Sequence, residues 1–170
     1  MKRIRGEVVK RERSVLENCV SGSFGLTIGC ALIWKIFREV MKRDNQKNNE
    51  ITSYYRILNQ WLVLKQDKKT VVNFFENNNY KTVAIYGMKE MTERLLDDLE
   101  NTGIVVKCII DRNAVVTDKC IPLLHPSDSI PDVDVVVVIP SYYFGKIKSK
   151  LKGKVRGDIV SIDDVVYSKY

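Results

Sequence analysis

The stretch VAIYGMKEMTERL, residues 83–95, decides the fold of this 170-residue chain. A short apolar run ends at Gly87, and a charged segment with helical spacing follows at once. A strand, a glycine bend and a helix in this order are typical of the first unit of a dinucleotide-binding βαβ fold. The stretch therefore predicts a fold of that class and raises the question of whether its site is intact.

The residues from Tyr80 onward repeat this pattern, because short β-branched runs alternate with helical patterns up to the end of the sequence. Such alternation is typical of a parallel sheet, and continuous Val/Ile runs fit strands that helices cover on both faces. We expect strands at 81–87, 104–111, 120–125, 133–140 and 158–162, and helices at 89–103 and 142–154. The predicted fold class is α/β: a Rossmann-like parallel sheet of about five strands with flanking helices, preceded by an α-helical N-terminal region.

Three parts are expected along the chain: a basic helical region over 1–50, amphipathic helices over 51–79 and the Rossmann-like domain over 80–170. Residues 41–50, MKRDNQKNNE, read as a linker or a frayed helix end. A helical stripe of apolar and aromatic residues follows, and it consists of Ile51, Tyr54, Tyr55, Leu58, Trp61 and Leu62. Helical spacing favours a packed core face over a base-stacking surface for nucleic acid.

Residues 18–34, NCVSGSFGLTIGCALIW, contain no charge and are flanked by basic segments. A membrane span needs about 20 mostly apolar residues, and this run is at the short limit. Gly25 and Gly29 have the G-x-x-x-G spacing that lets membrane helices approach closely. The alternatives are a marginal membrane anchor, a soluble helix that packs on a partner, and a role that is neither of these.

The net charge of +7 lies wholly in the first half, since residues 1–79 carry 15 Lys/Arg and 8 Asp/Glu, whereas residues 80–170 carry 13 of each. A basic arm is attracted to anionic lipid or nucleic acid, or is simply a solvated helical face.

The four cysteines have no C-x-x-C spacing and His125 is the single histidine, so neither a metal site nor a disulfide is expected. These features favour a cytoplasmic location, with membrane association as an option.

The glycine-rich turn is incomplete. Its three glycine positions are occupied by Gly87, Lys89 and Thr92. Only the bend glycine remains, and the Lys89 side chain falls where a pyrophosphate needs bare backbone. Asp111 ends the second predicted strand, 24 residues after Gly87, near the ~20-residue offset of an acid that binds a ribose hydroxyl. The predicted cofactor-contacting residues are Gly87, Met88, Lys89 and Asp111, with the cofactor itself left open.

The start of the following helix allows two interpretations. Its free N–H groups, its dipole and Lys89 favour an anion. Glu90 and Glu93 in the same turn satisfy that dipole themselves and repel phosphate. The alternatives are therefore a retained anion site and an inert, self-capped helix.

No catalytic residues are predicted, because the sequence has no nucleophile elbow and no Cys/His pair. His125 reads as a loop residue. Tyr142 and Tyr143 follow the fourth strand, at the edge where open α/β sheets bind ligands. The Tyr142–Lys146 spacing matches the Tyr-x-x-x-Lys pair of short-chain dehydrogenases and is read as a chance match.

Residues 53–114, together with VDVVVVIP (133–140) and SIDDVVY (161–167), resemble small Rossmann-like proteins of anaerobic Gram-positive bacteria. Those proteins are described as epimerase-like or sugar-nucleotide-related and are associated with cell-surface polysaccharide biosynthesis. The chain also looks like the nucleotide-binding-like end domains of sugar acyltransferases and methyltransferases. It keeps Gly87 of the family turn and departs at Lys89 and Thr92.

The resemblance implies a non-catalytic or degenerate nucleotide-binding-like accessory domain in cell-surface glycan biosynthesis. The alternative is an NAD- or nucleotide-sugar-dependent epimerase or dehydratase. A nucleic-acid binder that uses the basic arm ranks last, because residues 1–20 mix acids with the basic residues and lack aromatic readers. The expected partners are a nucleotide or sugar-nucleotide ligand, a membrane surface at the basic N-terminus, and a protein or second copy along the N-terminal helices.

Overall fold

The computed structural model describes the backbone of residues 2–87, 90–113 and 121–168, and the side chains of these ranges from residue 33 onward. The chain divides into two compact units, residues 1–48 and 49–170. We call them the N-terminal unit and the sheet unit.

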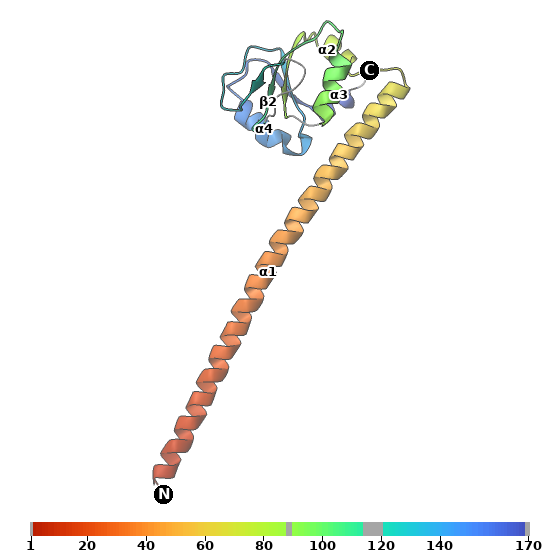
Figure 1. The fold of residues 1–170 in the computed structure, drawn as a ribbon. Helices are drawn as coiled ribbons and strands as arrows, with labels where there is room; N and C mark the ends of the chain where they lie inside the picture. The colour runs from red at the N-terminus through yellow and green to blue at the C-terminus, as the bar shows by residue number, and fades with distance from the viewer. Residues whose placement is uncertain (1, 88–89, 114–120, 169–170) are drawn as a thin grey trace. The chain divides into compact units, whose positions relative to one another are not determined.

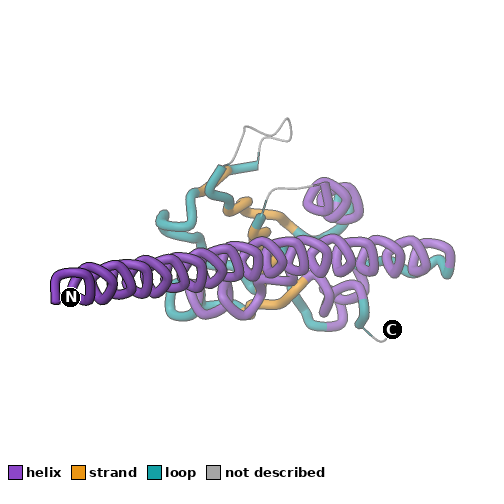
Figure 2. The backbone as a smooth tube through the Cα atoms, turned by 90° about the horizontal axis from the view of Figure 1, so that it is seen from below, coloured by secondary structure: helices purple, strands orange, loops and turns teal. Residues whose placement is uncertain are grey.

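Helix α1 (Lys2–Gln66) forms the whole described part of the N-terminal unit and continues into the sheet unit. Figure 2 shows this part of the chain as helix throughout, with every strand in the sheet unit. Residues 41–50 are helical, so the linker interpretation is wrong; no Gly or Pro between residues 30 and 66 interrupts the helix. Within the described residues, no helix combines the length and apolarity needed to cross a membrane. The span offered as one alternative for residues 18–34 is therefore not found.

The sheet unit contains five parallel strands in the order β3-β2-β1-β4-β5. The strands are β1 (Thr82–Tyr86), β2 (Val105–Ile110), β3 (Leu123–Leu124), β4 (Val135–Val138) and β5 (Asp158–Ser161). This confirms the predicted Rossmann-like α/β class. Each strand is shorter than the run predicted for it. At both ends of β4, for example, Val133 and Ile139 stay buried although they are not part of the strand.

Two apolar cores lie on the two faces of the sheet. On one face, α2 (Val72–Asn77), α3 (Glu90–Leu99), α5 (Ile162–Val166) and the C-terminal end of α1 contribute to the core. On the other face, α4 (Phe144–Leu151) does so. Figure 1 shows α3 and α4 on opposite sides of the strands. All four residues of β4 are buried, as expected for a strand that is covered on both faces.

The buried side of α1 in the sheet unit is centred on Ile57, Trp61 and Leu64. Of the predicted stripe, Tyr54 and Leu58 are partly buried and Trp61 is buried, whereas Ile51, Tyr55 and Leu62 are 62–68% exposed. The prediction of the buried face was therefore wrong: the face that is buried is rotated about the helix axis from the predicted one. Apolar residues occur on two adjoining sides here, and packing on α3 selects one of them. The Trp61 Nε1–H donates to Asp98 of α3 at 2.7 Å, and Lys65 pairs with the same carboxylate at 2.6 Å.

The end of the chain contains a helix that the sequence analysis missed. Ser161 caps α5: its Oγ accepts the Asp163 N–H, and the Asp164 carboxylate accepts the Ser161 N–H at 2.8 Å. The signal was present as Ser161-x-x-Asp164, a capping-box pattern before an apolar pair. The helix expected at 142–154 instead begins with a 3-10 turn, η1 (Ser141–Tyr143), and ends at Leu151.

Candidate functional site

The chain reverses its direction across the sheet between β1 and β4, which are neighbours although they are far apart in sequence. In open α/β sheets the crevice outside the carboxyl ends of the strands at such a switch point is where ligands bind. In this protein Gly87 follows β1 directly, and Pro140 lies two residues after β4. The candidate site is therefore built around these two loop segments.

Gly87 makes the bend with a φ of +101°, a region that residues with a side chain rarely adopt. A Cβ at this position would lie 3.0 Å from Cδ of Pro140. The Gly87 N–H donates to the carbonyl of Ile110, at the end of β2, at 2.8 Å. Both the backbone conformation and the proximity of Pro140 thus require glycine here.

Thr92, at the third glycine position, is fully buried. Its hydroxyl donates a hydrogen bond to the Gly87 carbonyl at 2.5 Å. The side chain that replaces the third glycine is therefore accommodated in the core, and its hydroxyl joins the first turn of α3 to the bend.

Met88 and Lys89 lie outside the described residues, so the predicted steric effect of Lys89 stays a prediction. Beyond them, α3 carries Glu90 and Glu93 in its first turn. The Tyr54 hydroxyl donates to the Glu90 carboxylate at 3.1 Å, and burial followed by this acidic neighbour raises the pKa of Tyr54. The start of α3 thus carries acids, one of which is already bound by α1.

A cavity of about 560 Å³ opens at this edge of the sheet. Its described lining consists of Tyr86, Gly87, Asp111, Arg112, Asn113, Pro140, Tyr143, Lys146, Ile147 and Lys150. We call it the edge cavity. Two of the four residues that were predicted to contact a cofactor, Gly87 and Asp111, line it.

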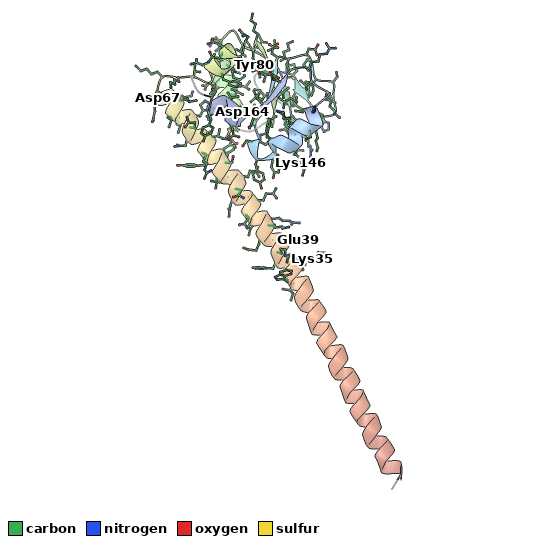
Figure 3. All side chains as sticks on the ribbon, turned by 180° about the vertical axis from the view of Figure 1, so that it is seen from behind. Lys35, Glu39, Asp67, Tyr80, Lys146 and Asp164 are labelled. Atoms are coloured by element: carbon green, nitrogen blue, oxygen red, sulfur yellow. The ribbon has the colours of Figure 1, made fainter. Side chains whose placement is uncertain are left out.

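Basic side chains dominate the charge of the edge cavity. Arg112, Lys146 and Lys150 line it, and Asp111 is the single acid among its described lining residues. Lys146 and Lys150 lie one turn apart on α4, and Figure 3 labels Lys146 on that helix. These basic residues were not among the site residues predicted from the sequence. A Lys-x-x-x-Lys spacing on the helix that follows the strand at the switch point was the signal.

Asp111 begins the loop that follows β2 and is partly buried. Its carboxylate accepts the Asn113 N–H at 2.8 Å, and its own N–H donates to the Leu124 carbonyl at 3.0 Å. These contacts hold the carboxylate at the carboxyl edge of the sheet, beside Arg112. An acid in this place can accept a hydrogen bond from a sugar hydroxyl.

The aromatic pair after β4 divides between two environments. Tyr143 lines the edge cavity, and its hydroxyl donates to Glu50 at 3.4 Å. Tyr142 is 45% exposed, packs edge-to-face on Tyr143 and lies outside the lining of the cavity. Lys146 thus shares the cavity with Tyr143 and not with Tyr142, so the Tyr142–Lys146 spacing builds no pair there.

The remaining polar candidates lie elsewhere. His125 sits in a turn with its Nδ1 2.6 Å from the Ser127 hydroxyl, away from the cavity lining. Cys108 is buried under α4, and burial raises the pKa of its thiol. Within the described ranges, no group of three or more His, Cys, Asp or Glu residues is placed to hold a metal ion.

The fold and this edge define the class: an α/β Rossmann-like domain with a basic cavity at its switch point. Comparison of the chain with protein-family models, with curated proteins and with solved structures gives no match.

Proposed function

We propose that the sheet unit is a nucleotide-binding-like accessory domain that holds a phosphate-bearing ligand, a nucleotide or a sugar nucleotide, in the edge cavity. In this proposal the domain presents or senses the ligand and does not transform it. The proposed setting is cell-surface glycan biosynthesis, which rests on the family resemblance of residues 53–167 alone.

The observation that carries the proposal is the composition of the edge cavity. Its volume of about 560 Å³ is in the ordinary range for a small-ligand site. Arg112, Lys146 and Lys150 offer charged donors of the kind that bind phosphate oxygens. Asp111 offers an acceptor for a sugar hydroxyl at the same rim.

The charges also suggest how the ligand is oriented. Glu90 and Glu93 make the start of α3 unfavourable for phosphate, whereas Lys146 and Lys150 of α4 are favourable. We therefore propose that the phosphates lie toward α4, away from the turn at Gly87. This orientation differs from the usual dinucleotide arrangement, in which the pyrophosphate lies on the first helix of the fold.

The test is calorimetric titration of the whole protein with NAD, NADP, UDP-sugars and CDP-sugars. Binding of one of them should raise the free energy of unfolding by about 3 kcal/mol at a hundredfold excess over its dissociation constant. Replacing both Lys146 and Lys150 by Ala should weaken that binding at least about tenfold, since each charged hydrogen bond contributes more than 1 kcal/mol.

Lys148→Ala is the matched control for this experiment. Lys148 lies on the same helix, over the Phe144 ring at 5.1 Å, and outside the cavity lining. Its loss should leave the affinity unchanged. Absence of binding across the panel, or equal losses in the control and the double variant, would contradict the proposal.

Turnover of the ligand distinguishes the enzyme alternative from this proposal. An epimerase or dehydratase would convert a sugar nucleotide that it binds, and chromatography of the ligand after incubation would reveal the product. Recovery of unchanged ligand from a protein that binds it supports the accessory role. The nucleic-acid alternative predicts retention on DNA or RNA that falls steeply with salt.

A further inference from the structure

The N-terminal unit carries a two-sided segment, residues 33–43, that the proposed function does not use. Six of its residues are apolar and are 45–68% exposed: Ile33, Trp34, Ile36, Phe37, Val40 and Met41. At 100° per residue they fall within about 160° of the helix circumference. We call this side the apolar face.

All the charged residues of the segment lie on the remaining side. They are Lys35, Arg38, Glu39, Lys42 and Arg43, which give a net charge of +3. Figure 3 labels Lys35 and Glu39, one helical turn apart on α1. No residue of 33–43 breaks the separation of the two sides.

Trp34 stands at the border between the two sides. The Arg38 guanidinium lies over its ring, 3.5 Å from the ring centre. An aromatic ring with one apolar side and one charged neighbour suits the boundary between lipid headgroups and acyl chains. A large apolar face with Trp and Phe, opposite a side rich in Lys and Arg, is the composition of helices that lie in the plane of a membrane surface.

A second copy of the chain fits the apolar face less well. The seam of a helix pair is narrower than this face, because it uses two positions in seven. One turn beyond Val40, Asp44 lies in line with the centre of the face, so the apolar face ends there. In a parallel pair of copies in register, the two Asp44 carboxylates would oppose each other across the seam.

From this arrangement we propose that residues 33–43 lie on an anionic lipid surface, with the apolar face in the headgroup region and the basic side toward the lipid phosphates and water. The positive charge of the segment complements an anionic bilayer, and each basic residue near such a surface adds attraction. The occupant is a lipid surface, and the segment lies along it.

The test measures binding of the full chain to vesicles made of equal parts phosphatidylglycerol and phosphatidylcholine. Trp34 is the reporter, since it is 59% exposed, whereas the other tryptophan, Trp61, is 4% exposed. Binding should shift the Trp emission to shorter wavelength. Vesicles of phosphatidylcholine alone, or high salt, should weaken binding about a hundredfold, because about three net charges lose their attraction.

Phe37→Glu places an acid in the apolar face and should weaken binding at least about tenfold. Leu62→Glu is the matched control, because Leu62 is also on α1, is 62% exposed and lies outside the face. The control should bind as the parent does. Thermal unfolding of both variants establishes that the sheet unit is intact.

Three outcomes would overturn the proposal. One is an absence of vesicle binding with an unchanged Trp spectrum. Another is binding that persists in Phe37→Glu and at high salt, which would assign membrane attachment to another segment. The third is a dimer in sedimentation that Phe37→Glu dissociates, together with no vesicle binding, which would assign the face to a second copy.

Discussion

The hydroxyl of Thr92 donates a hydrogen bond to the carbonyl of Gly87, and the two atoms are 2.5 Å apart. The bond joins the first turn of α3 to the bend after β1, where a dinucleotide-binding fold brings helix and strand together with a small glycine. Thr92 is fully buried, so water has little access to the Gly87 carbonyl and cannot readily replace the hydroxyl as its donor.

Thr92→Val removes this hydroxyl at nearly constant volume. We expect it to lower the free energy of unfolding by about 1–3 kcal/mol, because a buried acceptor loses its donor. Thr92→Ser keeps the hydroxyl and should lose less. Urea unfolding of the two variants measures the difference, and a Val variant as stable as the parent would show that the bond adds nothing.

Gly157 should not tolerate alanine. A Cβ there would overlap the Val133 carbonyl and lie 2.5 Å from the Asp134 carbonyl oxygen, both of which are backbone atoms beside β4. We expect Gly157→Ala to cost about 1–3 kcal/mol through overpacking. Gly145→Ala is the control: a Cβ there meets nothing within 4 Å, and alanine favours α4, so thermal unfolding should show equal or slightly higher stability.

Asp134 gives the sheet unit an acid-sensitive contact. Its carboxylate accepts the N–H groups of Lys81 and Thr82 at 2.8 and 2.7 Å, and the Thr82 hydroxyl at 2.9 Å. These hydrogen bonds, the one from the Lys81 N–H first, lower the pKa of Asp134 below its ordinary value. A lowered pKa in the folded state stabilises the fold above the ordinary pKa, and this contribution is lost as the pH falls through the lowered value.

The Asp134→Asn variant should therefore melt at a lower temperature than the parent at pH 7. The difference should shrink as the pH falls below about 4, because the carboxylate becomes protonated first in the unfolded chain and then, at its lowered pKa, in the folded protein. Asp132→Asn is the control, because Asp132 is 71% exposed and forms its side-chain ion pair with an exposed Arg156. A melting difference for Asp134→Asn that is the same from pH 7 to pH 3 would contradict the assignment.

Lys89 is predicted from the sequence to obstruct the usual pyrophosphate position. Lys89→Gly should then create or strengthen NAD binding, and Lys89→Ala should lie between the two. If the lysine instead attracts a phosphate, both variants should bind more weakly than the parent. Calorimetric titration with NAD distinguishes these two orders of affinity, and identical affinities in all three proteins would show that Lys89 neither obstructs nor attracts the diphosphate.

The order of elements could be predicted because its signals are local. The run before Gly87 and the Val-rich run at 133–140 each show their strand character within a few residues, and the alternation with helices leaves few possible topologies. The side of α1 that is buried within the sheet unit could not be predicted in the same way. Ile57 and Leu62 are both apolar and close together in sequence, and only packing in the core of the sheet unit decides that the first is buried and the second exposed.

The candidate site shows the same difference between residues with a local sequence signal and residues whose role depends on packing. Gly87 and Asp111 were predicted because each lies at the end of a strand, and the end of a strand can be recognised in the sequence. The basic residues of the cavity were missed, because their effect depends on position in space: α4 brings Lys146 and Lys150 to the rim where Arg112 follows β2.

The sequence by itself thus determined that the chain forms a parallel α/β sheet with one remaining turn glycine, because backbone preferences and apolar periodicity act over a few neighbouring residues. The tertiary structure alone decided that Thr92 closes the turn, and that basic residues from one loop and one helix line a common cavity with one acid. Charge and hydrogen bonding between such residues depend on distance in space, and folding of the sheet sets that distance.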